Sequence, residues 1–349
     1  MKFGVQLPTG MEAMSIPTPF FRPDDFFAMA RTLEWLGYDS LWGNDHYAPQ
    51  EYIRGMYATT PNFFEVMTVL TAAAAVTSRI EVGTSVLVLP MRDIIPIAKQ
   101  VATLDQLSGG RLLLGVGIGA YREEFAAARP DLVGANRGAM LEEGLELLGR
   151  LFSETAVTHH GRHYHVKSID VVPKPARRPF PILVGGHQKA TLDRVVRYGQ
   201  GWIPGWRPLD ELKEWIAILR DKAAAAGRDP ASIVVAPQFS CFLGRTQEQA
   251  EARYKESGMV QHRVSLAYTG RDPVLAMANN LIGSPEHVLE KVERLHEIGV
   301  DHLSAMSLTV GSVSGFSEQV HWFAEEVMPP YRRSRAILEP ADPPAAVRP

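Results

Sequence analysis

The sequence predicts a (β/α)8 barrel with insertions, and three observations favour this fold. The chain has 349 residues, a length that a single barrel domain reaches. Short apolar segments alternate strictly with helical patterns, and this alternation is typical of parallel sheets. The pattern repeats eight times, which is the number that closes a barrel. A doubly wound open sheet is the alternative, although eight parallel strands exceed what one such unit normally needs.

Each expected strand is a short run of apolar or β-branched residues that ends at turn-forming residues. The expected strands are Lys2–Pro8, Ser40–Gly43, Ile80–Leu89, Arg111–Gly117, Ile182–Gly185, Gly201–Ile203, Ile233–Leu243 and His302–Met306. Each expected helix carries apolar residues at helical spacing. The expected helices are Asp24–Leu36, Asn62–Val76, Ile94–Leu107, Arg137–Phe152, Lys189–Tyr198, Leu209–Ala226, Pro285–Ile298 and Ser317–Val327.

Several helix ends are marked in the sequence. Ser284-Pro285-Glu286 supplies a capping residue, an N1 proline and an acidic first turn. A glycine follows each of four helices, in the place that a left-handed C′ residue takes. These glycines are Gly37, Gly109, Gly227 and Gly299.

Two segments interrupt the repeat and are expected to be insertions on the barrel. Residues about 155–180 alternate apolar and polar side chains and leave through a Pro-rich stretch, and residues about 247–282 hold extra helical patterns. The barrel domain is then 1–333. Residues 334–349 are rich in Pro, Ala and charge without periodicity, which is the composition of a disordered tail.

Composition excludes several classes of protein. The formal net charge is −3 without a dense Lys/Arg cluster, so the basic footprint of a nucleic-acid binder is absent. No apolar run reaches the ~18 to 20 residues that span a bilayer. The single cysteine, Cys241, permits no internal disulfide, and its apolar surroundings predict a buried, inert thiol. Met1 to Val5 enter a strand directly rather than forming a signal peptide, so we expect a cytoplasmic protein.

The working residues of a barrel lie at the carboxyl ends of its strands and in the loops that follow. Asp45 and His46 follow the second strand. A carboxylate next to an imidazole supplies charge and a group that titrates near neutral pH. We therefore predict that both are catalytic. An Asp that caps the next loop, beside a His bonded to backbone, is the structural alternative.

Glycines mark two further strand ends. Gly185-Gly186 opens the fifth helix, whose unpaired amides suit a phosphate. Gly117 and Gly119 end the fourth strand and let a flat or anionic ligand approach the backbone. In both places the alternative is that the glycines serve only a tight turn.

Other catalytic classes find no support in the sequence. A serine hydrolase of the G-x-S-x-G type lacks its nucleophile motif. Four histidines alternate in the first insertion without a Cys or carboxylate at ligand spacing, so we predict an exposed hairpin and no metal. They are His159, His160, His163 and His165.

Four segments carry a resemblance to the bacterial luciferase-like monooxygenase superfamily, which extends from about Lys2 to Arg332. They are Leu36–Trp42 leading to Asp45-His46, Arg79–Val86, Ala102–Gly119 and Pro181–Gly186. Members are (β/α)8 barrels that use FMN or the deazaflavin F420. The resemblance therefore implies this fold, one of these two cofactors and a homodimer.

The resemblance also implies roles for individual residues. His46 would be the active-site imidazole, with Asp45 beside the flavin. Ser85-Val86 would form a non-prolyl cis peptide bond against the central ring of the cofactor. Gly185, Gly186 and His187 would form the phosphate loop, and Gly117, Gly119 and Glu123 would line the cofactor.

The chain departs from the family pattern at two places. Family members often have Arg-His-Pro after the third strand, where this chain has Arg92-Asp93-Ile94. Several deazaflavin dehydrogenases place Glu just after the GxG, where this chain has Ala120. A sugar-phosphate dehydrogenase is therefore disfavoured. Asp-His after the second strand resembles the deazaflavin branch more than the Glu-His of the luciferases.

We predict an oxidoreductase that transfers a hydride between F420 and a small organic substrate. The alternative is an FMN-dependent monooxygenase, which uses O2 and reduced flavin; a separate reductase would supply the reduced flavin. A third possibility is a flavin-binding barrel without turnover. Apolar and aromatic side chains expected at the mouth suggest a moderately hydrophobic substrate. They are Met91, Tyr121, Trp206 and Met306.

Overall fold

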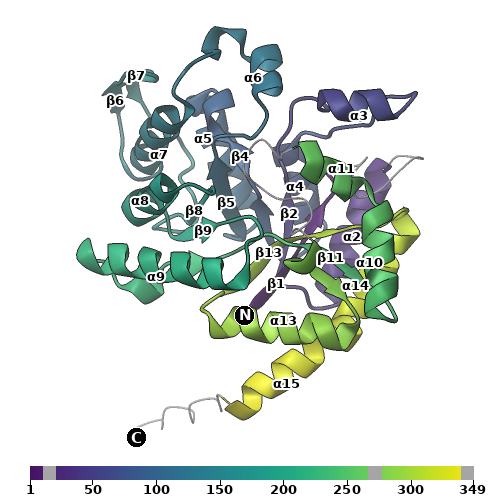
Figure 1. Ribbon diagram of the computed structural model, residues 1–349. Helices are drawn as coiled ribbons and strands as arrows, with labels where there is room; N and C mark the ends of the chain where they lie inside the picture. Colours follow the sequence, from purple (N-terminus) through teal and green to yellow (C-terminus); the bar gives the residue numbers. More distant parts are fainter. Residues whose placement is uncertain (11–20, 266–276, 339–349) are drawn as a thin grey trace, which may run out of the picture.

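The computed structural model describes residues 1–10, 21–265 and 277–338, and a curled parallel sheet surrounded by helices forms its centre (Figure 1). The strands are β1 Lys2–Leu7, β2 Ser40–Gly43, β3 Glu81–Thr84, β4 Leu87–Val88, β5 Leu112–Gly117, β8 Ile182–Gly185, β9 Gly201–Ile203, β10 Val234–Val235, β11 Ser240–Leu243, β12 Leu281–Gly283 and β13 His302–Leu308. Their order is β10-β9-β8-β5-β3-β2-β1-β13-β11-β12, and β4 pairs with β5. The fold class predicted from the sequence is confirmed.

The segment from β10 to β11 connects the β9 side of this sheet to its β13 side. β10 pairs with β9 through Val234 and Gly201, whereas β11 pairs with β13 through Ser240 and Ser307. Between β10 and β11, the carbonyl of Pro237 accepts from the Ser304 N–H at 3.1 Å. The strand predicted over 233–243 is therefore two short strands. β10 pairs with β9 and β11 pairs with β13, and together they close the barrel. The split falls at Pro237, which has no N–H for the ladder.

The helices cover the outside of the barrel. They are α2 Pro23–Trp35, α3 Glu51–Met56, α4 Val66–Ala75, α5 Ile94–Leu107, α6 Arg122–Ala128, α7 Arg137–Ser153, α8 Lys189–Tyr198, α9 Leu209–Ala225, α10 Gln247–Glu256, α11 Gly258–Ser265, α13 Pro285–Glu297, α14 Val313–Glu326 and α15 Met328–Leu338. All eight predicted helices are present, with ends shifted by a few residues. The four glycines predicted at helix ends have φ values from 67° to 95°, and the Ser284 side chain accepts from the His287 N–H.

The sequence did not predict α3, α6, α15 or β12. The helices predicted within 247–282 correspond to α10 and α11, but β12 ends in the same segment and pairs with β11. The predicted disordered tail was wrong at its start, because α15 continues to Leu338. Residues 339–349 lie outside the described part of the chain.

The barrel interior is filled below its mouth. Trp42 lies inside with Leu183, Ile203 and Ala305. A Cβ atom on Gly83 would lie 2.4 Å from Trp42 Cε3, so only glycine leaves room for the indole. The indole N–H donates to Ser40 Oγ at 2.7 Å, and His302 Nε2 lies 2.7 Å from the same oxygen. Burial lowers the pKa of His302 to about 3.

The conspicuous segment Asp105–Arg111 lies at the amino ends of the strands, opposite the mouth. Asp105 is buried and accepts from the Ala176 N–H at 2.8 Å. The guanidinium of Arg111 donates to the carbonyls of Ala74 and Ile80, each at 2.8 Å. This part of the family-like pattern therefore holds the scaffold together.

The first insertion forms the predicted hairpin, from β6 Val157–His160 and β7 His165–Ile169. Its anchor is Glu143 of α7, whose carboxylate accepts from the N–H groups of His163 and Tyr164 and lies 3.1 Å from His159 Nε2. His159 therefore has a carboxylate partner that spacing in the sequence did not suggest.

Two smaller predictions can also be compared with the structure. Cys241 is fully buried, as predicted, and burial raises the pKa of its thiol to about 12. Across the described residues, no helix has the length and apolar character needed to cross a membrane.

Candidate active site

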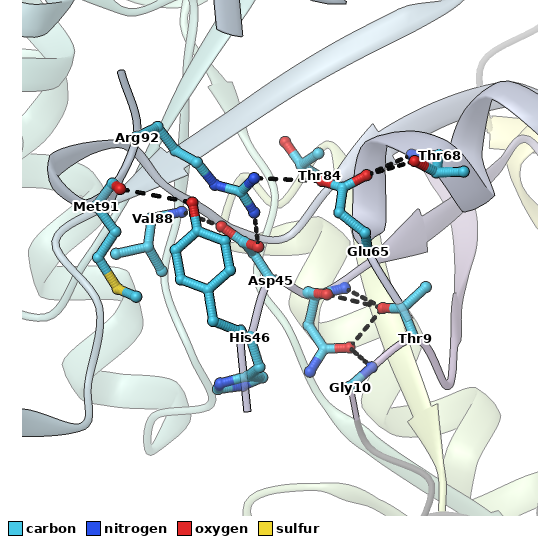
Figure 2. A network of polar contacts seen from close by, with 12 residues as sticks. Thr9, Gly10, Asp45, His46, Glu65, Thr68, Thr84, Val88, Met91 and Arg92 are labelled. Carbon is cyan, nitrogen blue, oxygen red and sulfur yellow. Dashed lines mark hydrogen bonds and ion pairs between the residues drawn. The ribbon is translucent and has the colours of Figure 1, made fainter. Parts of the chain in front are cut away.

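Asp45 and His46 leave β2 in extended backbone, and their side chains point in opposite directions (Figure 2). The Asp45 carboxylate is 5% exposed, accepts from the Val88 N–H at 2.9 Å and forms an ion pair with Arg92. Burial raises the pKa of Asp45, and the charge of Arg92 opposes that rise. Arg92 also reaches Glu65 at 3.3 Å. Asp45 thus ties the loop after β2 to the loop after β4.

His46 takes its carboxylate partner from another part of the chain. Its Nδ1 lies 3.0 Å from Glu124 Oε2, and the other oxygen of Glu124 accepts from the Tyr47 N–H at 2.6 Å. Gln50 Nε2 also lies 3.0 Å from Nδ1. Glu124 belongs to α6 and is buried. The two contacts of its carboxylate fix the orientation of the imidazole.

Asp45 and His46 were both predicted to be catalytic, and the structure gives their side chains different partners. Their side chains alternate across an extended backbone, as they do along a strand. Asp45 contacts Arg92, and His46 contacts Glu124. Glu124 is therefore a site residue that the sequence reasoning missed. The signal available was a second acidic residue next to Glu123, at the start of a helix after the fourth strand.

The peptide bond between Ser85 and Val86 is cis, as the resemblance implied. This bond separates β3 from β4 within the single strand predicted over Ile80–Leu89. Gln238 Nε2 donates to the Ser85 carbonyl at 3.1 Å and also contacts its hydroxyl. The bond therefore lies at the mouth, between β3 and the segment that closes the barrel.

Val86 accounts for two of the glycines singled out in the sequence. A Cβ atom on Gly117 would lie 2.7 Å from Val86 Cγ2, and one on Gly185 would lie 2.7 Å from Val86 Cγ1. These glycines make room for a side chain of the protein itself. Gly119 has a φ of 75°, and its added Cβ would lie 2.8 Å from Val88.

The loop before α8 carries the predicted phosphate residues. Gly186 has a φ of 153°, and its N–H donates to the Ile203 carbonyl at 3.3 Å. The His187 ring lies over Gly205, where an added Cβ would be 2.6 Å from it. The N-cap residue of α8, Gln188, makes no side-chain hydrogen bond to the first turn. The first turn of α8 thus lacks the side-chain cap that Ser284 gives α13.

A cavity of about 570 Å³ is lined by Tyr121, a neighbour of His46, and its volume is within the range of small-molecule sites, about 300 to 1,000 Å³. The Tyr121 ring is 6.0 Å from the His46 ring, measured between centroids. The cavity is lined by Glu51, Tyr52, Tyr121, Arg122, Glu123 and Ser265. Two predicted residues, Tyr121 and Glu123, therefore meet there.

The other residues predicted to contact substrate are more scattered. Met91 packs with Val88 and Phe125 at the base of α6. Trp206 follows β9 and is 6% exposed. Met306 is 1% exposed and packs in the large core with Leu303, so the structure does not bring it to the mouth. The expectation that Met306 faces the substrate was wrong, because its side chain belongs to the core.

Comparison with known proteins now adds to this geometry. Residues 1–302 match the family described as luciferase-like monooxygenase. The chain belongs to this family.

Two curated relatives of this luciferase-like chain illustrate the range. An FMNH2-dependent dimethylsulfone monooxygenase of Pseudomonas putida is 26% identical over 295 residues, which cover 77% of this chain and 78% of the relative. An F420-dependent glucose-6-phosphate dehydrogenase of Kineococcus radiotolerans is 28% identical over 305 residues, which cover 81% and 87%. The luciferase-like chain is therefore an oxidoreductase whose relatives use either cofactor.

A solved structure supports the fold independently. The crystal structure of a monooxygenase from Streptomyces bottropensis has a TM-score of 0.77 with the luciferase-like chain, at 22% identity. The match covers 95% of this chain and 100% of that one. At this identity the likeness concerns the barrel alone.

Proposed function

We propose that this luciferase-like oxidoreductase transfers a hydride between the deazaflavin F420 and a small organic substrate, with His46 as the proton-transferring residue. The observation that carries the proposal is the Glu124-bound imidazole, whose neighbour Tyr121 lines a cavity of about 570 Å³. The F420-dependent relative supports this choice of cofactor. So does the Asp-His pair after β2, which resembles the deazaflavin branch.

The residues present fit such a cofactor. The cis bond at Ser85–Val86 turns the backbone at the mouth, and a flat ring would lie against it. The Gln188 side chain does not cap the first turn of α8, so the N–H groups that begin this helix would bind the phosphate, in the loop that holds Gly186 and His187. The Gly186 N–H itself donates to the Ile203 carbonyl. When bound, F420 would supply the site that accepts or donates the hydride.

His46 handles the proton that accompanies this transfer. A carboxylate oxygen only accepts, so the contact at 3.0 Å makes Nδ1 of His46 the donor to Glu124. With this tautomer, the Gln50 amide has to face Nδ1 with its oxygen, because its NH2 can only donate. Nε2 is then the nitrogen that takes a proton from the substrate, or returns it in the reverse direction. Glu124 acts as a positioning residue, because it holds the ring and the tautomer. Asp45 and Arg92 fix the loop on which His46 stands.

Titration of the purified protein with F420 and with FMN, each in both redox states and followed by fluorescence, tests the cofactor. We expect saturable binding of F420. Tight binding of FMN without binding of F420 would overturn the proposal.

The second candidate is an FMN-dependent monooxygenase, which the Pseudomonas putida relative favours. In that case a separate reductase would supply reduced flavin, and His46 would assist the reaction of that flavin with O2. The same titration separates the two candidates. A homodimer and a cytoplasmic location stay predictions, which gel filtration and cell fractionation would test.

A further inference from the structure

Two buried N–H donors near the mouth have no acceptor among the described residues. Arg263 of α11 reaches toward β11, where its Nη2 donates to Ser240 Oγ at 3.1 Å, while its Nε is buried and unpaired. The guanidinium carbon lies 5.9 Å from the centre of the Trp206 ring. Trp206 Nε1 is likewise buried and unpaired. Both groups can only donate, so both lack an acceptor.

A guanidinium that contacts only neutral hydroxyls, here those of Ser240 and Tyr254, is costly to bury. Charged groups away from water are normally paired with an opposite charge. Two arginines with side chains only 10% exposed follow that rule, since Arg92 contacts two carboxylates and Arg207 pairs with Glu211. Among the described residues, Arg263 has no carboxylate within ion-pair distance. Burial lowers the pKa of Arg263.

The position of Arg263 links it to the candidate active site. His262, the preceding residue, has its Nδ1 3.0 Å from Tyr121 Oη and 3.2 Å from Tyr52 Oη. Both tyrosines line the cavity, and the Tyr121 ring neighbours that of His46. The end of α11 therefore lies over the mouth, on the same side as α3 (Figure 1).

We propose that Arg263 and Trp206 bind an oxyanion of the substrate, so that the substrate is an organic acid with an apolar body. A carboxylate or sulfonate supplies two or more acceptor oxygens, which would satisfy the unpaired Nε and Nε1 together. The apolar body would extend toward the aromatic walls formed by Tyr52 and Tyr121. This proposal rests on the proposed function, because it places the substrate in the cavity beside His46.

The test measures binding to the cofactor-free protein by calorimetry, with benzoate, hexanoate and benzenesulfonate as probes and benzamide as the neutral control. We expect the protein to bind at least one of the acids and not the amide. Arg263→Met should weaken that binding about ten- to hundredfold, the loss expected for a hydrogen bond to a charged group. Trp206→Phe, which keeps the ring but removes the N–H, should weaken it about tenfold.

The matched control is Arg253→Met, which removes an exposed arginine of the same insertion that pairs with Glu256. It should leave acid binding unchanged. Because Arg263 lacks a counter-charge, Arg263→Met should not lower the melting temperature of the ligand-free protein. If Arg263→Met fails to fold, Arg263 has a structural role and the proposal is wrong.

The anion could instead belong to the cofactor. Titration of Arg263→Met with F420 and FMN distinguishes these sources, since cofactor affinity should not change if the anion is the substrate's. A tenfold loss of cofactor affinity, or no binding of any acid to the wild-type protein, would overturn the proposal. Acid binding needs no turnover, so its failure is distinct from failure of the hydride-transfer proposal.

Discussion

The contact between Glu124 and His46 offers the sharpest test of the proposed site. In Glu124→Gln, the amide oxygen can still accept from the Tyr47 N–H, which now lies 2.6 Å from a carboxylate oxygen. The amide NH2 then faces His46 Nδ1, so the ring must present the opposite tautomer. The ionic hydrogen bond at 3.0 Å is lost, at a cost of about 1.5 to 3 kcal/mol.

We expect kcat to fall about 10- to 100-fold, because each 1.4 kcal/mol, roughly, changes a rate tenfold. KM should change little, since Glu124 is not expected to contact substrate. The assay is steady-state turnover with the cofactor identified by titration, together with 15N spectra of the histidine rings. The spectra should show that His46 moves its proton from Nδ1 to Nε2.

The control is Glu143→Gln, which removes a carboxylate with the same kind of contacts, to His159 Nε2 and to two N–H groups of the hairpin. This variant should lose stability but keep kcat. If Glu124→Gln retains kcat within about twofold, or if Glu143→Gln loses as much, the positioning role of Glu124 is wrong.

Three further predictions follow from the same structure. His46→Ala should lower turnover about 10²- to 10⁴-fold, the usual contribution of a general acid or base, and unchanged turnover would favour a barrel without catalysis. Gly117→Ala should destabilise the protein by about 1 to 3 kcal/mol in urea unfolding, because the new Cβ meets Val86 at 2.7 Å. Adding Val86→Ala should restore most of that loss. The pKa of His302 is about 3 when folded and returns to its ordinary value on unfolding, so only the unfolded chain binds the proton between about pH 6.5 and 3. Stability is therefore full above that window and should fall by about 2 kcal/mol from pH 6.5 to 5, a slope that His302→Gln should remove.

Local pattern predicted most of the fold, and contacts distant in sequence account for what it missed. The eight strand positions of the barrel and their helices were visible as alternation and helix-end signals. β12 was not, because three residues carry no periodicity and its stability comes from pairing with β11. The start of α15 follows α14 directly and packs through Tyr331 on Phe3. No local signal reports such packing.

The sequence predicted which positions carry the candidate site residues, but not which side chains contact them. Asp45 and His46 follow the second strand, and the bond between Ser85 and Val86 is cis, as expected from the sequence. The partner of His46 could not be found, because 78 residues separate it from Glu124. Arg263 was missed for a similar reason, since it reaches the mouth only through the fold of its insertion.

The size of the side chain at position 86 affects the shape of the barrel mouth. The two methyl groups of Val86 occupy the spaces that Gly117 and Gly185 leave open, so neither glycine can be enlarged unless the residue at position 86 becomes smaller. In a set of related sequences, a larger residue at either glycine should coincide with a smaller one at position 86. Conversely, alanine at position 86 would open space beside the cis bond without touching His46. Libraries aimed at bulkier substrates should therefore begin at this position.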